Sequence, residues 1–223
     1  MDAKSNRLYG VYPARVANNV DPENQGRLQV QMPRFGKETE KDNSAWARLA
    51  TLMAGKERGT WFIPDVGDEV LVAFEGGDPR RPYVIGALWN ADQPPPESMD
   101  GGGKNNIRSI VSRQGIRITL DDSEGLETVT IRTPGGQEVV LKDQPPSILI
   151  QDSSNNQVSL EPAGIHISTS GKLSLSAAVV EISASLVSAS AGMARFSGVV
   201  QADTIIANSV VSNSYTPGVG NVM

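Results

Sequence analysis

The sequence predicts an all-β protein in two parts, a small closed barrel followed by a shaft in which copies of the chain intertwine as a threefold β-prism or β-helix. Three observations support this fold class. Short segments of alternating apolar and polar residues recur along the 223-residue chain, with turn residues between them. All three tryptophans precede residue 92. Residues 171–223 carry only four charged side chains.

The first half supplies the predicted barrel strands. Residues 27–32 alternate cleanly, and residues 69–74 are apolar on both faces, which predicts a strand covered on both sides. Residues 82–89 form a further strand, with a bulge or a close backbone approach at Gly86. Several short strands within about 90 residues, mostly without helices, are typical of a small closed barrel.

One segment of this half is ambiguous. Trp46, Leu49 and Met53 fit a helical stripe, whereas Ala45, Ala47 and Leu49 fit the alternation of a strand. We expect a strand through Leu49, followed by a short turn or helix.

The aromatic residues are expected to give the first half a core of its own, because large rings bury much area per residue. They are Trp46, Trp61, Trp89, Tyr9, Tyr12, Tyr83, Phe35, Phe62 and Phe74. The run from Asp92 to Lys104, with three prolines and three glycines, reads as a linker. We therefore predict a barrel over residues 1–92, a linker over 93–106 and the shaft over 107–223.

The second half consists of short apolar bursts spaced by roughly 7 to 12 residues, the pattern of stacked β-structure. They are Ile116/Ile118/Leu120, Val129/Ile131, Val139/Leu141, Ile148/Ile150, Val158/Leu160, Ile165/Ile167, Leu173/Leu175 and Val180/Ile182/Ala184/Leu186. Their small and β-branched side chains suit a narrow shaft better than a thick sandwich.

Charge points to self-association of this shaft. From Gly171 onward the charged residues are Lys172, Glu181, Arg195 and Asp203. As a lone chain, this stretch would expose β-prone edges of low charge, which is an aggregation hazard. Intertwining with copies of itself pairs every edge, and a threefold assembly is the simplest closed solution.

Composition restricts the function. A net charge of −5 and a pI of about 5.0 argue against a general nucleic-acid binder. The chain has no cysteine, hence no disulfide framework and no thiolate metal site. No signal peptide or membrane helix is expected, because no apolar run is long enough.

Three stretches carry a family resemblance: GRLQVQMP (Gly26–Pro33), WARLATLMAG (Trp46–Gly55) and the long run from Trp61 to Asn90, which contains PDVGDEVLVAF and GDPRRPYVIGALWN. In this order and spacing they resemble the oligomer-binding (OB) barrel of the central spikes of contractile injection systems. That family includes phage baseplate spikes, the VgrG spikes of type VI secretion and the spikes of extracellular injection systems. The matches cover roughly residues 7–92, and the stacked strands agree with the family's trimeric β-helix.

The resemblance implies a trimeric needle of the baseplate, with an N-terminal OB-fold barrel under the hub and tube and a β-helix pointing at the target membrane. The chain shows neither the lysozyme domain of some phage spikes nor the fused hub of VgrG, so a separate hub protein is expected. The chain itself would be assembled in the cytoplasm into a phage tail-like particle. That particle would stay in the cytoplasm, be anchored to a membrane or be released.

By the same resemblance, the C-terminal end is expected to be blunt and to bind a separate PAAR-repeat tip protein. The residues expected to bind this partner are Tyr215, Pro217, Val219 and Met223. Paired histidines bind iron at the tip of some phage spikes, but His166 is the only histidine here and lies far from the end. No metal, cofactor or catalytic residue is therefore expected.

Polar clusters offer other interpretations. Asp65, Asp68 and Glu69 could be catalytic carboxylates, but they flank Gly67 where turn-forming acids are common. Arg80 and Arg81 could hold phosphate, although local carboxylates or the hub are better partners.

The glycine run 101–104 lacks the Ser/Thr and the first glycine of a phosphate loop, so we interpret it as a linker. His166 is expected to face away from Ile165 and Ile167, and three copies of it outside the shaft would lie too far apart to bind one metal ion.

Two alternatives to a structural spike stay open. A trimeric β-helix could cleave surface polysaccharide, as some phage tailspikes do, with Asp121, Asp122 and Glu124 as the available carboxylates. The barrel aromatics could stack single-stranded nucleic acid. However, residues 1–92 carry 12 Lys and Arg against 13 Asp and Glu, so no basic groove is expected.

Overall fold

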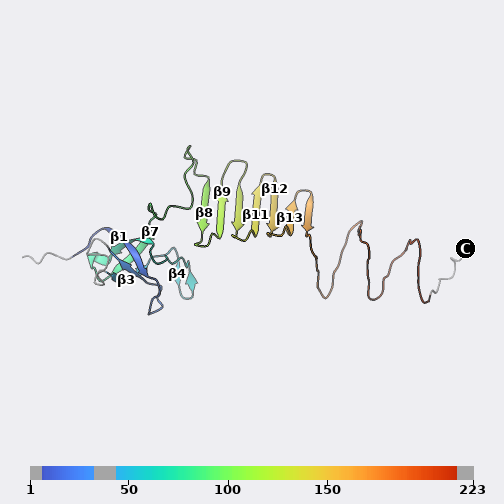
Figure 1. Cartoon of the computed structure of the whole chain (residues 1–223), viewed down its shortest axis with the longest axis horizontal. Helices are drawn as coiled ribbons and strands as arrows, with labels where there is room; N and C mark the ends of the chain where they lie inside the picture. The colour runs from blue at the N-terminus through green and yellow to red at the C-terminus, as the bar shows by residue number, and fades with distance from the viewer. Residues whose placement is uncertain (1–6, 33–43, 215–223) are drawn as a thin grey trace, which may run out of the picture. The chain divides into compact units, whose positions relative to one another are not determined.

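The computed structural model describes residues 7–32 and 44–214. The chain divides into two compact units, Met1–Leu173 and Ser174–Met223. The first unit holds a barrel and a separate sheet, and its described helical structure is the short turn η3 (Glu75–Gly77) (Figure 1). The described part of the chain is thus all-β, as predicted, and it contains no helix long and apolar enough to cross a membrane.

A closed five-stranded barrel forms the N-terminal part of the first unit, in the order β1-β2-β3-β7-β6. The strands are β1 (Val11–Asn18), β2 (Leu28–Gln31), β3 (Ser44–Leu49), β6 (Glu69–Phe74) and β7 (Pro82–Ala87). The β3–β7 pair is parallel and the other four pairs are antiparallel. Closure leaves no unpaired edge in this sheet, and the predicted barrel is confirmed.

The barrel interior is filled by aliphatic side chains that alternate along the strands. Leu28 and Val30 from β2, and Val70 and Val72 from β6, are fully buried, as the alternation of these segments predicted. Among the described residues, the core consists of Ala14, Val16, Leu28, Val30, Met32, Ala47, Val70, Val72, Phe74 and Val84. On the other face of β6 the side chains are half-buried, so this strand is only partly covered on both sides.

The expectation of an aromatic core is wrong. Trp61 and Trp89 are 77% and 71% exposed, and Phe62 and Tyr9 also lie on the surface. Of the described aromatic residues, only Phe74 belongs to the buried core, where its ring meets that of Tyr12 edge to face at 5.6 Å; Phe35 lies outside the described residues. Five strands enclose a narrow interior, and small branched side chains fill it without room for indole rings.

The ambiguous segment resolves as a strand followed by a hairpin. β3 ends at Leu49 as expected, and the chain then turns back through β4 (Ala54–Gly55) and β5 (Arg58–Gly59) instead of forming a helix. The expected bulge near Gly86 is present: Leu71 pairs with Gly86 but Val72 pairs with Val84, so Ile85 is the extra residue.

Seven antiparallel strands follow the barrel as a meander in which each strand pairs with the next. They are β8 (Ile107–Val111), β9 (Arg117–Asp121), β10 (Thr128–Arg132), β11 (Glu138–Asp143), β12 (Pro146–Gln151), β13 (Gln157–Glu161) and β14 (Gly164–Ser168) (Figure 1). Six of them carry the apolar bursts predicted between Ile116 and Ile167. The sequence did not indicate β8.

The second unit has no helix or strand between Ser174 and Ser214, and every described residue in it is exposed. Its backbone runs back and forth with recurring bends (Figure 1). The apolar bursts predicted after Leu173 therefore find no partner strand among the described residues of the chain. The intertwined shaft, and the domain boundaries drawn around it, stay predictions.

Candidate functional site

One face of the seven-stranded sheet carries two rows of aliphatic side chains. Residues directly opposite each other in antiparallel strands point to the same side of a sheet, as do residues two apart in one strand. The pairing therefore defines each row across all the strands. The first row is Ile110, Ile118, Ile131, Val139, Ile150, Val158 and Ile167, and the second is Leu120, Val129, Leu141, Ile148, Leu160 and Ile165.

The opposite face is mostly polar. Its central row is Ser109, Thr119, Thr130, Val140, Leu149, Ser159 and His166. His166 thus lies on the face away from Ile165 and Ile167, as the alternation predicted. The sheet is strongly amphipathic, and we refer to the side with the two aliphatic rows as the apolar face.

The apolar face is not covered by the described residues of the chain. Ile110 is 51% exposed, Ile150 49% and Ile165 71%, whereas side chains of the same kind in the barrel are fully buried. Contiguous apolar surface of this extent on a folded protein marks a site of association. The individual bursts were visible in the sequence, but their alignment into rows depends on the register of every hairpin.

The acidic cluster at the entrance to β6 is tied into local structure. The Asp65 amide donates to the Asp68 carboxylate at 2.8 Å, and the Gln93 side chain donates to the same carboxylate at 3.2 Å. Glu69 accepts from the Asn90 side chain at 2.7 Å. The Asp65 carboxylate pairs with Arg113 at 3.1 Å. These bonds support the reading of the cluster as turn structure.

The arginine pair after β6 binds carboxylates of its own loop. Arg80 donates from Nε and a terminal nitrogen to both oxygens of Asp78, at 3.0 and 2.8 Å, and lowers the pKa of that carboxyl. Arg81 donates to Glu75 at 3.1 Å. A 2.7 Å hydrogen bond from the Tyr83 hydroxyl, followed by the Arg81 charge, lowers the pKa of Glu75. Of the two expected partners, the local carboxylates are observed.

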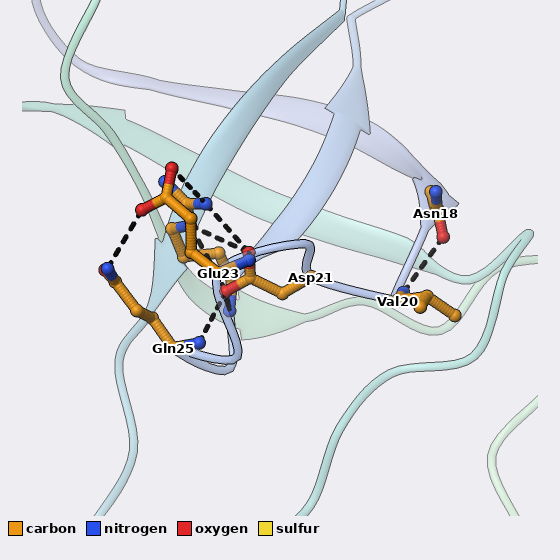
Figure 2. Close-up of polar contacts among 6 residues, drawn as sticks. Asn18, Val20, Asp21, Glu23 and Gln25 are labelled. Carbon is orange, nitrogen blue, oxygen red and sulfur yellow. Dashed lines mark hydrogen bonds and ion pairs between the residues drawn. The ribbon is translucent and has the colours of Figure 1, made fainter.

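The loop between β1 and β2 is organised around a buried carboxylate (Figure 2). Asp21 accepts backbone N–H bonds from Glu23 at 3.0 Å, Gln25 at 2.8 Å and Arg27 at 3.1 Å. The Arg27 guanidinium adds a contact of 2.8 Å to the same carboxylate and is the main cause of its lowered pKa. The sequence indicated a turn here, but the Asp21–Arg27 pair was missed.

Arg27 also limits access to the aromatic surface of the barrel. Its guanidinium carbon, held by Asp21, lies 5.7 Å from the centroid of the Trp46 ring. The guanidinium carbon of Arg48 lies 5.6 Å from the centroid of the Tyr83 ring. These two rings already have a cation as a neighbour at the face that a nucleic-acid base would use.

The glycine loop 101–104 wraps around an acid of its own. The Asp100 carboxylate accepts from the amides of Gly102 at 2.9 Å, Lys104 at 3.1 Å and Asn105 at 3.1 Å. These hydrogen bonds lower the pKa of the Asp100 carboxyl, and the one from the Lys104 amide has the largest effect. A phosphate loop would direct such amides at its ligand, so the geometry supports a connecting loop.

The carboxylates proposed for glycan cleavage do not converge. Asp121 accepts a hydrogen bond from the Ser123 amide at 2.9 Å, and hydrogen bonds from Ser123 lower the pKa of the Asp121 carboxyl. Asp122 forms an ion pair with Arg108 of the neighbouring strand β8, and Glu124 is exposed. In the part of the chain that is described, no group of three or more Asp, Glu and His side chains is arranged to hold a metal ion. Tyr215, Pro217, Val219 and Met223 lie outside the described residues.

Two family models match the chain. Residues 12–89 match the type VI secretion system/phage-baseplate injector OB domain. Residues 128–193 match the phage baseplate V C-terminal trimerisation domain. The first match coincides with the barrel, and the second begins at β10 and extends into the second unit.

The chain is also similar to spike proteins of type VI secretion systems. It is 30% identical over 112 residues to both VgrG1b and VgrG1a of Pseudomonas aeruginosa, covering 48% of this chain and 15% and 17% of those proteins. It is 27% identical over 135 residues to VgrG3 of Vibrio cholerae, covering 58% of this chain and 13% of that protein. The chain thus covers less than a fifth of each relative.

Proposed function

Because the chain belongs to the spike proteins of contractile injection systems, we propose that it is the structural central spike of the baseplate of such a machine. It acts as a homotrimer that joins the hub and tube to the membrane-piercing tip. The observation that carries this proposal is the uncovered apolar face of the seven-stranded sheet, most of which falls within the match to a trimerisation domain.

Three copies related by a threefold axis would bury their apolar faces against one another. The two rows run across the strands, so three sheets brought together enclose one continuous aliphatic core along the direction in which the strands stack. The polar faces then point to solvent. A cyclic arrangement closes without leaving a free surface of the same kind, which prevents open-ended association.

The second unit has the same need for partners. Its described residues from Ser174 to Ser214 alternate apolar and small polar side chains, and all are exposed in a single chain. Neighbouring copies would supply the strands that pair its backbone N–H and C=O groups. An intertwined shaft of this kind has no free edges, which suits a needle that must transmit the force of sheath contraction without unfolding.

The partners follow from this role. A separate hub protein binds at the barrel end, and a PAAR-repeat tip protein binds at the C-terminal end through Tyr215, Pro217, Val219 and Met223. The protein works within a phage tail-like particle, assembled in the cytoplasm and retained there, anchored to a membrane or released. Its role is mechanical and not enzymatic: its acids serve loops and ion pairs, and the relatives are named as spikes. The polysaccharide-cleaving alternative gains no support from them.

The proposal is tested in assembled particles. The protein is produced together with the sheath, tube, hub and tip proteins of a contractile injection system, and contractile particles are purified. Quantitative mass spectrometry is expected to find three copies per particle, and electron microscopy of a tagged chain to locate them at the baseplate. Particles that assemble and penetrate target cells equally well without this protein would refute the proposal.

Binding of the tip protein has its own test. A chain with Tyr215→Ala and Val219→Ala is expected to remain trimeric but to lose capture of the tip protein in a pull-down. Ser212→Ala, a few residues earlier, serves as the matched control and is expected to retain capture. Unchanged capture by the double variant would remove these residues from the tip site without affecting the trimer.

A further inference from the structure

The apolar face repeats nearly the same surface at successive strands. Each strand from β9 to β14 contributes one residue to each row, and all twelve residues are Ile, Leu or Val. If one copy slides along another by two strands, aliphatic side chains meet aliphatic side chains again, on strands that run in the same direction. Apolar packing alone therefore specifies the alignment of the copies only weakly.

The first strand of the sheet breaks this repetition. On β8, Ile110 continues the first row, but Arg108 occupies the position in the second row, directly opposite Leu120. Its guanidinium pairs with the carboxylate of Asp122, the residue that directly follows β9. The Asp122 amide donates to the Asn106 carbonyl at 2.9 Å, which holds this acid beside β8.

We propose that the Arg108–Asp122 pair sets the register in which the three copies assemble, an inference that rests on the trimer proposed above. In the correct register, three such pairs meet at the level of β8 and form a ring of alternating charges. In a trimer slipped by two strands, the pair of one copy would lie against Val129 and Ile131 of the next.

The charges make slipped assemblies unfavourable because ionised groups that are buried against aliphatic surface lose their water without gaining charged partners from other copies. A single polar position in an otherwise apolar seam fixes register in coiled coils by the same physics. Both side chains are more than half exposed in the single chain, at 55% and 61%, so they are accessible to other copies.

Register can be measured by disulfide formation, since the chain has no cysteine of its own. Two differently tagged chains are co-expressed, one with Ile131→Cys on β10 and the other with Ile150→Cys on β12. These positions lie two strands apart, about 9–10 Å, which exceeds the roughly 7 Å between Cα atoms that a disulfide can bridge. Aligned copies form only 131–131 and 150–150 disulfides, whereas copies slipped by two strands form 131–150 disulfides.

With Arg108 and Asp122 intact, we expect almost no mixed 131–150 disulfide. In the double variant Arg108→Leu with Asp122→Leu, we expect the mixed disulfide to rise by roughly tenfold or more, because the variant no longer has to remove an ion pair from water in the slipped register. The matched control is Arg132→Leu with Glu138→Leu, a directly opposed pair on the polar face. It is expected to keep the register of the unmodified chain.

The outcomes separate this inference from the proposed function. The leucine variant could form trimers with the same disulfides as the cysteine variants in which Arg108 and Asp122 are intact. That result would overturn the register role and leave the trimer intact. A swapped variant, Arg108→Asp with Asp122→Arg, keeps the charge pair and is expected to stay in register, so mixed disulfides there would also overturn it. If the cysteine variants with Arg108 and Asp122 intact are monomeric and form no disulfides at either position, the trimer itself fails.

Discussion

At the scale of the residue, aspartate side chains organise the loops of this chain. Asp21, Asp78, Asp100, Asp121 and Asp152 each accept a hydrogen bond from the backbone amide two residues later. In every case the pKa of the carboxyl falls below its ordinary value, because hydrogen bonds and neighbouring cations favour the ionised form. These acids therefore stabilise loops in their ionised form.

Lowered pKa values predict loss of stability in acid. The unfolded chain binds protons at a higher pH than these folded carboxyls do, so their stabilisation is complete above the ordinary aspartate value of about 3.9 and is lost as the pH falls below it. The melting temperature, followed by tryptophan fluorescence, is expected to decline below this pH. A melting temperature that holds constant between pH 5 and pH 2 would contradict the role given to these acids.

Asp21→Asn tests the most heavily bonded of these acids. The amide removes the charge that Arg27 and three backbone N–H groups face, so we expect a lower melting temperature at pH 7. The difference from the unmodified chain is expected to shrink as the pH falls below about 3.9, because the Asp21 carboxyl of the unfolded chain then binds a proton while that of the folded chain stays ionised. Asp92→Asn changes an exposed acid after the barrel and is expected to have no measurable effect.

At the scale of the element, two kinds of β-surface differ in what covers them. The inner faces of the barrel strands are fully buried within one chain, whereas the apolar face of the sheet is not. The narrow barrel buries its aliphatic core within one chain, and Trp61 and Trp89 lie on the surface. The sheet has the amphipathic pattern of one layer of a larger assembly.

Two identical substitutions test the corrected barrel core. Leu28→Ala removes a fully buried side chain and is expected to lower the free energy of unfolding by about 2–5 kcal/mol. Leu52→Ala makes the same change at a side chain that is 97% exposed, where we expect less than about 0.5 kcal/mol. Urea titration monitored by tryptophan fluorescence measures both, and equal losses would show that the core is misassigned.

Neighbouring substitutions on β12 test the two faces of the sheet. Ile150→Asp would bring one carboxylate from each copy onto the axis, and an unpaired buried charge costs about 3–5 kcal/mol. We therefore expect monomers in light scattering. Gln151→Asp places the same charge on the polar face of the same strand, and trimers are expected to persist. Trimers that tolerate both changes would mean that another surface mediates assembly.

Sequence alternation was sufficient to predict most of the strands, because a half-buried strand must alternate. It did not indicate β1, β4 or β5, and it was insufficient for β8, whose residues IRSIV place an arginine where the pattern requires an apolar side chain. It was also insufficient for the barrel core, since the aromatic residues indicated a large interior and the closed geometry allows only a small one. The Asp21–Arg27 pair depends on how the loop closes, which residue types alone do not encode.

At the scale of the whole molecule, a single chain leaves much apolar surface exposed. Within one chain, the aliphatic side chains of one sheet face are exposed or half-buried, and the described residues of the second unit are all exposed. The sequence predicted a need for partner chains from low charge and β-propensity, and the match to a trimerisation domain agrees with it. The pairing within the shaft was beyond prediction because it depends on contacts between copies.

The mass of the intact protein in solution tests the central claim most directly. Sedimentation equilibrium of the full chain, repeated over a wide range of concentrations, gives this mass without assumptions about shape. The account predicts a single species of three times the chain mass of 23.7 kDa. A folded species with the mass of one chain at working concentrations would contradict it.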